Sequence, residues 1–190
     1  FGKWIPDKTG MPVIIIDRGR NYSDGHRILG DGKSWNGLIG GGIFSGMLFI
    51  MAHNIWNGNG TDAPFIDPLS YADSSDWFWF FGGELSSSFA AFTMGFVLGF
   101  SCMVGDMCGS FVKRRRGLKR EGDESSEAPL LDTIPFAIAI FAASFLLFDG
   151  QIITHPNLVE EIIFLLIITP VIHRSFNILG YKFGLKEVPY

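Results

Sequence analysis

Four long apolar segments divide the chain, and shorter polar or charged segments separate them. The apolar segments occupy residues 38–56, 85–105, 134–153 and 162–179. A helix needs about 20 residues to cross the roughly 30 Å of bilayer hydrocarbon, and each segment is close to that length. None shows the period-two alternation of a membrane β-strand. The pattern therefore predicts an all-α, polytopic membrane helix bundle with four spans in this chain.

Basic residues fall on one side of the predicted bundle. All 15 Lys and Arg residues lie before the first segment, between the second and third, or from the end of the fourth onward, while 57–76 and 155–161 contain none. Cytoplasmic segments of membrane proteins collect Lys and Arg. We therefore predict a multi-pass protein of the cell membrane with a cytoplasmic segment at 1–37, a transmembrane catalytic domain at 38–190 and a cytoplasmic loop at 106–133, where the active site would lie.

Composition narrows the class of protein further. Of the 190 residues, 47% are apolar and only 18% are charged, which excludes a disordered chain and a disulfide-rich secreted scaffold. Cys102 and Cys108 lack the spacing of a redox or zinc motif, and we interpret them as packing residues. The glycine pairs whose spacing of four suits close helix packing are Gly42/Gly46 and Gly95/Gly99. We expect no nucleic-acid partner and infer no obligate protein partner.

The first candidate site is a Gly-rich segment just before the first span. Its residues are Gly30, Asp31, Gly32, Lys33 and Ser34. The glycines let backbone N–H groups approach an anion, Lys33 supplies a cation, and Ser34 can cap the following helix. A Walker A loop would need a glycine at position 27, where the chain has Arg27, so a P-loop NTPase is disfavoured. The alternative is an ordinary capped helix start with interfacial basic residues.

The second candidate site follows the second predicted span. If the helix continues there, Asp106, Ser110 and Lys113 share one face by their spacing of four and three, with Arg114 adjoining. An acid able to hold a divalent cation would then lie beside bases able to hold phosphates. The alternative is a topology signal or a contact with anionic lipid head groups, which explains Arg115 well but leaves Asp106 unexplained.

Two further polar groups lie at the same predicted membrane face. Asp132 precedes the third span at a depth similar to Asp106, so the two carboxylates can converge on Mg²⁺, unless Asp132 is only a helix N-cap. His173, Arg174 and Asn177 end the last span, where they can line a substrate groove or merely snorkel to the interface. Acids suited to Mg²⁺, bases suited to phosphate and a membrane location together predict phosphoryl or nucleotidyl transfer involving a lipid.

Four ordered motifs resemble the archaeal CDP-archaeol synthases. They are Arg27-Ile-Leu-Gly-Asp-Gly-Lys-Ser-Trp35, Gly105-Asp-x-x-Gly-Ser-Phe-x-Lys-Arg-Arg-x-Gly-Leu-Lys119, Pro129-Leu-Leu-Asp132 and the terminal Gly184-Leu-Lys-Glu-Val-Pro-Tyr190. The match runs from about Asp17 to the C-terminus. The resemblance implies an integral membrane cytidylyltransferase that requires Mg²⁺. In such an enzyme the phosphate of digeranylgeranylglyceryl phosphate, an isoprenoid ether lipid of archaea, attacks the α-phosphorus of CTP to give CDP-archaeol and pyrophosphate.

The same resemblance assigns roles to the candidate residues. The pattern at 105–114 is also similar to the signature of bacterial and eukaryotic CDP-diacylglycerol synthases. Carried over, Asp106 and Asp132 would be metal ligands, with Lys113 as a third catalytic group. The implied nucleotide or phosphate contacts are Ser110, Arg114, Arg115 and the loop Gly30, Asp31, Gly32, Lys33 and Ser34. The candidates for contact with the lipid substrate are Arg27, His173 and Asn177.

The chain also departs from the family pattern. Pro135 stands where members commonly carry a second acid, and Asn36 stands where they commonly have a basic residue. The family usually has one more span before Asp17, so five spans are expected with that segment included. Among rivals, a CDP-alcohol phosphotransferase would need a cluster of four Asp residues. A small transporter or channel for an anionic solute would need polar or broken positions at mid-membrane, and Pro170 is the only proline well inside a span.

Overall fold

The computed structural model describes residues 4–56, 67, 69, 87–118, 129–147 and 157–184. The helices in these ranges are α1 (Trp4–Thr9), α2 (Trp35–Trp56), α3 (Ser87–Arg115), α4 (Pro129–Leu147) and α6 (Leu158–Lys182). Extended pairing in the same ranges is confined to two isolated bridges in the segment before α2. The predicted all-α class is therefore confirmed for the part of the chain that the structure describes.

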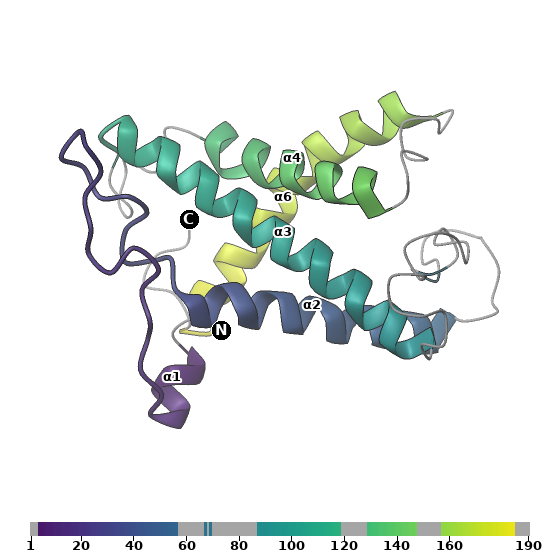
Figure 1. Cartoon of the computed structure of the whole chain (residues 1–190). Coiled ribbons are helices and arrows are strands. Elements are labelled where there is room, and N and C mark those ends of the chain that lie inside the picture. The colour runs from purple at the N-terminus through teal and green to yellow at the C-terminus, as the bar shows by residue number, and fades with distance from the viewer. Residues whose placement is uncertain are drawn as a thin grey trace.

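The helices form a bundle in which neighbours in sequence are neighbours in space. Helix α3 packs between α2 and α4, and α6 crosses behind them and touches α4 (Figure 1). The first residues of α2 and α4 and the last residues of α3 and α6 lie at one end of the bundle, together with the segment 10–34 (Figure 1). We call this the polar end. The alternating direction that the sequence predicts for the spans is thus present in the fold.

Glycines allow α2 and α3 to approach closely. A Cβ at Gly46 would lie 2.7 Å from the ring of Phe92, and a Cβ at Gly99 would lie 2.4 Å from Cβ of Ser45. A Cβ at Gly95 would lie 2.7 Å from the carbonyl oxygen of Ser45. Small residues at such interfaces let helix backbones meet, which is how helices associate in a membrane. The packing role predicted for these glycine pairs is confirmed.

A second close contact joins α3 to α4, and the sequence interpretation missed it. A Cβ at Gly105 would lie 2.4 Å from Cα of Phe136 and 2.6 Å from the carbonyl oxygen of Pro135. One turn later, a Cβ at Gly109 would lie 2.7 Å from the carbonyl oxygen of Leu131. Gly105 and Gly109 are again four apart, and they flank Asp106. The contact therefore fixes the height of Asp106 against the first turns of α4.

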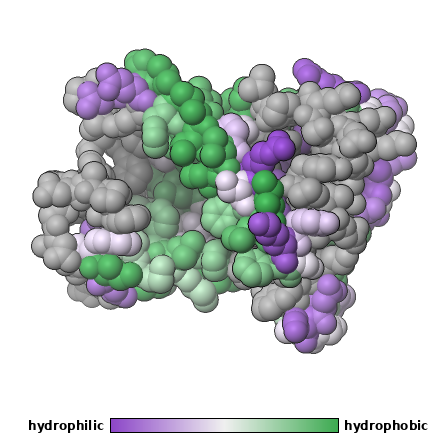
Figure 2. Space-filling model, turned by 180° about the vertical axis from the view of Figure 1, so that it is seen from behind, coloured by the Kyte–Doolittle hydropathy of each residue, from purple (hydrophilic) through white to green (hydrophobic). Residues whose placement is uncertain are grey.

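Three of the described helices, α2, α3 and α6, are long and apolar enough to cross a membrane. The apolar part of α4, Thr133–Leu147, is shorter, and the predicted third span runs on into residues outside those described. Four spans in this chain therefore stay a prediction. Apolar side chains are widely exposed, among them Phe164 at 63% and Ile167 at 65% on α6. Figure 2 shows hydrophobic residues over the middle of this face, with hydrophilic residues at its margins and beside the hydrophobic region on one side; a broad exposed hydrophobic surface is expected for a protein surrounded by lipid.

Candidate functional site

The segment 10–34 folds back on itself at the polar end and joins directly to α2. One bridge pairs Ile15 with Ser34, where the Ile16 amide donates to the Lys33 carbonyl at 2.9 Å and the Trp35 amide donates to the Ile14 carbonyl at 2.9 Å. The hydroxyl of Ser34 accepts a hydrogen bond from the Gly37 amide at 3.1 Å. Ser34 thus caps α2, as its position in the sequence predicts.

Asp17 lies at the centre of this segment, and the sequence interpretation gave it no role. Its side chain is only 1% exposed. Its carboxylate accepts hydrogen bonds from the backbone amides of Gly19 at 3.1 Å, Leu29 at 3.0 Å and Gly30 at 2.9 Å. The only hint in the sequence is a single acid directly after three isoleucines, which is a poor place for a solvated carboxylate.

Arg27 completes the surroundings of Asp17. Its guanidinium donates to Asp17 at 2.8 and 3.3 Å and to Asp31 at 2.7 Å. Burial alone would raise the pKa of Asp17, but the hydrogen bonds from Arg27 and the three amides hold it well below its usual range. The hydrogen bonds to Asp17 and Asp31 raise the pKa of Arg27. Arg27, a candidate for lipid contact from the sequence, is therefore already held by two carboxylates.

We expect the Asp17 carboxylate to stay ionised in the folded protein when the pH is lowered to about 4, where free aspartate is half protonated. Because folding lowers its pKa, its stabilising effect is complete above the ordinary value of 3.8 and is lost only as the pH falls through the lower folded value. A ¹³C NMR titration of the labelled carboxyl, with a peptide of residues 12–22 as the unfolded reference, measures this. Matching titration curves in protein and peptide would show that the hydrogen-bonded cage is not formed.

Lys33 connects the Gly-rich segment to α3. Its ammonium group forms an ion pair with the Asp106 carboxylate, across 73 positions of sequence. The Asp106 side chain is 44% exposed, so it retains room for a further cation. A partly exposed ion pair adds little to the free energy of unfolding. This one matters because it brings the Lys33 ammonium and the Asp106 carboxylate to the same place. Two sites predicted separately from the sequence are here brought into one.

Helix α3 carries the second candidate site beyond the apolar part of the bundle. Its 29 residues extend about 43 Å at 1.5 Å per residue, more than the hydrocarbon thickness requires. It ends where the Gly117 amide donates to the Arg114 carbonyl and the Leu118 amide donates to the Lys113 carbonyl, each at 3.1 Å, with Gly117 at φ +73°. This is a Schellman motif, which needs a residue that tolerates positive φ. The helix therefore continues past residue 105, and Asp106, Ser110 and Lys113 do lie on one helix face.

Arg114 packs against the Gly-rich loop. Its Nε donates to the Leu29 carbonyl at 3.5 Å, and a Cβ at Gly30 would lie 3.3 Å from that same Nε. Gly30 also has φ +94°, a conformation that residues with a Cβ rarely adopt. Gly30 is therefore needed for the turn, and the Arg114 side chain packs closely against it. The loop therefore contacts α3 twice: Lys33 pairs with Asp106, and Arg114 packs beside Gly30.

Arg115 joins the segment 10–34 to α3 from the other side. Its guanidinium lies over the rings of Tyr22 and Phe111, at 4.9 and 4.7 Å from their centroids, and the two rings contact each other edge to face at 5.6 Å. It also donates to the carbonyl oxygens of His26 and Arg27, and its Nε is 3.0 Å from Asp24. The two aromatic rings are missing from the sequence-based site, because nothing in the sequence pairs Tyr22 with a residue on α3. The phosphate contact expected of Arg115 stays a prediction, and in this structure the side chain fastens the segment to the helix.

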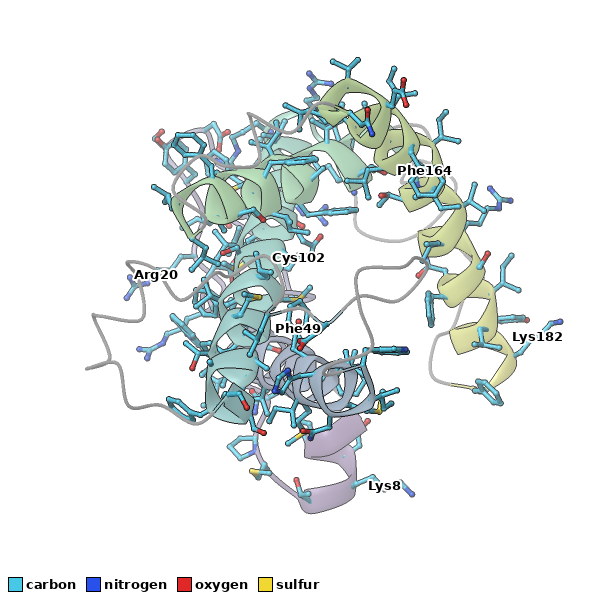
Figure 3. The ribbon with its side chains drawn as sticks, turned by 90° about the vertical axis from the view of Figure 1, so that its right-hand side faces the viewer. Lys8, Arg20, Phe49, Cys102, Phe164 and Lys182 are labelled. Carbon is cyan, nitrogen blue, oxygen red and sulfur yellow. The ribbon has the colours of Figure 1, made fainter. Side chains whose placement is uncertain are left out.

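A cavity of about 350 Å³ adjoins the Asp17 turn. Its lining residues are Ile16, Asp17, Arg18, Arg20, Ile28, Leu29 and Trp35. Arg20, at its edge, extends away from the helices, as does Lys182 at the end of α6 (Figure 3). The cavity thus combines an apolar wall with cationic side chains, directly beside the loop that carries Lys33.

The remaining candidates are placed less completely. Asp132 lies in the first turn of α4, next to Leu131, whose carbonyl packs against Gly109 of α3. The side chains of Asp132 and His173 are not among those that the structure describes. The convergence of Asp132 with Asp106 therefore stays a prediction. Asn177 is half-buried near the end of α6. Among the described side chains, no group of three or more His, Cys, Asp or Glu could hold a metal ion.

Comparison with known proteins gives a consistent family. A family model for CarS-like CDP-archaeol synthase matches residues 9–68 and 81–190. The chain is 36% identical to the CDP-archaeol synthase of Methanospirillum hungatei, with 95% of this chain and 90% of that protein aligned. It is 37% identical to the CDP-archaeol synthase of Picrophilus torridus, over 93% of this chain and 84% of that protein. The corresponding protein of Pyrococcus horikoshii is 36% identical, over 96% and 89%.

One solved structure shares the fold. It is described as an intramembrane enzyme for the biosynthesis of archaeal membrane lipids, and it superposes with a TM-score of 0.54 at 23% sequence identity. The match covers 88% of this chain and 83% of that one. At this identity the likeness supports the helical arrangement, while the residues of the site rest on the contacts described above.

Proposed function

The chain belongs to the CarS-like family of CDP-archaeol synthases and is a membrane cytidylyltransferase, and from this we propose that it transfers CMP from CTP to digeranylgeranylglyceryl phosphate. An oxygen of the lipid phosphate forms a bond to the α-phosphorus of CTP while the bond from that phosphorus to the β-phosphate oxygen breaks. The products are CDP-archaeol and pyrophosphate. The observation that carries this proposal is the meeting of Lys33 and Asp106 at the polar end of a membrane bundle.

The chain's own residues suit a reaction between two anions. Lys33 and Arg114 bring positive charge to the Gly-rich loop, and Lys113 lies one residue from Arg114, on the face of α3 that carries Asp106. These cations would stabilise the negative charge that develops on the departing pyrophosphate. No strong general base is required, because a phosphate monoester loses its second proton near pH 6 and is already a nucleophile at neutral pH. The work of the site is therefore positioning and electrostatic stabilisation.

The proposal includes Mg²⁺, and carboxylate oxygens are suitable ligands for this ion. When bound, Mg²⁺ would neutralise the triphosphate and align it for in-line transfer. Proteins usually hold Mg²⁺ by one or two carboxylates and leave the other positions to phosphates and water. Asp106, with its half-exposed carboxylate, and Asp132, in the adjoining turn of α4, would be those carboxylates.

The membrane supplies the second substrate. Helices α2, α3 and α6 are long enough to span it, and Asp106, about 20 residues into α3, would then lie near the depth of lipid phosphates. Asn177 and His173, near the end of α6, stay candidates for lipid contact. The one-sided distribution of Lys and Arg supports a cytoplasmic position for this end, where CTP is available.

The decisive assay follows radioactive phosphorus from the nucleotide into the lipid. Purified protein in detergent is incubated with α-³²P-labelled CTP, Mg²⁺ and digeranylgeranylglyceryl phosphate, with and without EDTA. We expect label to enter the organic phase only when metal is present, and γ-³²P-labelled CTP to leave the organic phase unlabelled. EDTA should reduce labelling to that of a protein-free control, because the triphosphate is then neither neutralised nor aligned.

The same preparation separates this proposal from the transporter alternative, which the family membership does not favour. Label that remains in water-soluble nucleotide, from folded protein that still binds CTP, would contradict cytidylyl transfer. Uptake of unchanged CTP into proteoliposomes would then favour transport. Transfer of label from γ-³²P-labelled CTP to the lipid would instead indicate a kinase.

A further inference from the structure

The residue that organises the nucleotide loop does not itself belong to the reacting groups. Asp17 is buried, and all its observed partners are within the segment 10–34: one guanidinium and three backbone amides. With its side chain 1% exposed and its oxygens accepting five hydrogen bonds, it has no open face for a nucleotide or a metal ion. Asp17 can therefore affect the reaction only through the backbone groups that it holds in place.

What Asp17 holds is the backbone on both sides of Lys33. Its Oδ2 accepts from the Leu29 and Gly30 amides, which fixes the start of the turn that the Lys33 amide closes onto the Gly30 carbonyl at 3.2 Å. Ile16, the residue before Asp17, donates to the Lys33 carbonyl at 2.9 Å. The amide and the carbonyl of Lys33 are thus both tied to elements that Asp17 anchors.

We infer that Asp17 is a positioning residue for the nucleotide site: it locks residues 29–33 in the one conformation that aims Lys33 at Asp106. This inference rests on the proposed function, and it extends that function to a residue remote from the phosphates. A loop held in its working shape before the substrate arrives avoids the entropic cost of ordering it on binding. The charge of Asp17 is essential here, because a carboxylate can accept from all four donor groups at once while an amide cannot.

The substitution Asp17→Asn tests this with almost no change in volume. One side-chain acceptor becomes an NH₂ donor that faces N–H groups, so the turn at 29–30 loses its anchor. We expect the KM for CTP to rise about tenfold or more, while the KM for the lipid phosphate changes less than about twofold. Helix packing through the glycines of α2 and α3 does not involve Asp17, so the bundle should remain folded. The matched control is Asp7→Asn, an exposed acid on α1, which should leave both KM values unchanged.

A double-mutant cycle distinguishes positioning from a general structural role. If Asp17 acts by aiming Lys33, then Asp17→Asn should change the KM for CTP by less than about twofold in a Lys33→Met background, because the group being aimed is already absent. Full additivity of the two effects would overturn the inference. So would an equal rise in both KM values for the Asp17→Asn single variant, which indicates general loosening.

A second variant keeps the test open if Asp17→Asn does not fold. Arg27→Lys retains the positive charge but loses the paired hydrogen bonds to Asp17, and it should raise the KM for CTP more mildly and leave that of the lipid unchanged. A rise in the lipid KM alone would instead make Arg27 a lipid contact and contradict the inference. Failure of the wild-type protein to transfer label rejects the proposed function. Normal wild-type activity with an unchanged KM for CTP in Asp17→Asn rejects only the role of Asp17.

Discussion

The substitution Asp106→Asn is expected to lower cytidylyl transfer by about 10³-fold or more, since losing even one preorganised electrostatic group costs about 10²–10³ in rate. Asn has almost the same shape but no charge, so it cannot neutralise a cation or pair with the Lys33 ammonium. The fold should persist, because α3 packs against its neighbours through Gly105 and Gly109 while the Asp106 carboxylate is 44% exposed. Initial rates with α-³²P-labelled CTP measure the loss, and a thermal melt in detergent checks the fold.

The control for this prediction is an acid that lies far from the polar end. Glu160 is exposed in the first turn of α6, and Glu160→Gln removes the same charge without touching α3. We expect it to retain wild-type rates. A folded Asp106→Asn protein that transferred label at the wild-type rate would remove Asp106 from the proposed mechanism. If Glu160→Gln instead lowered the rate as much as Asp106→Asn does, the effect of both substitutions would come from the change in net charge alone.

The sequence predicted the bundle and the shared helix face well because both depend on local, periodic signals. The face formed by Asp106, Ser110 and Lys113 follows from spacings of three and four on a continuous helix, and α3 contains no proline. The Ser34 cap follows from one residue type at one position. The ion pair of Lys33 with Asp106 was not predicted, and only the family resemblance assigned both segments to one CTP site.

The role of Asp17 could not be predicted in the same way. Two of its partners are backbone amides 12 and 13 positions along the chain, and an amide leaves no signature in the side-chain sequence. The run Lys113, Arg114 and Arg115 shows a related limit. Arg114 and Arg115 are identical neighbours in the sequence, yet Arg114 packs on Gly30 while Arg115 lies over the rings of Tyr22 and Phe111. The difference arises from where the segment 10–34 docks, which is a tertiary property.

The second large effect is expected in the fold itself, from Gly105→Leu. A Cβ there would lie 2.4 Å from Cα of Phe136 and 2.6 Å from the Pro135 carbonyl, so the new side chain meets backbone that cannot rotate aside. Helices α3 and α4 must separate, and overpacking of a close interface costs about 3 kcal/mol or more. For a chain of this size that lowers the melting temperature by about 10 °C. Thermal unfolding in detergent, followed by circular dichroism, measures the shift.

The matched variant is Cys108→Leu, which introduces the same side chain about one turn along the same helix but at an exposed position. It should melt within about 2 °C of the wild type, because its side chain meets lipid or detergent instead of a helix. Equal melting temperatures for the two variants would show that Gly105 does not set the α3–α4 contact. If Gly105→Leu does separate the helices, activity should fall together with stability, since the same contact sets Asp106 against the turn of α4 that carries Asp132. The glycine would then determine the geometry of the proposed metal site from within the membrane bundle.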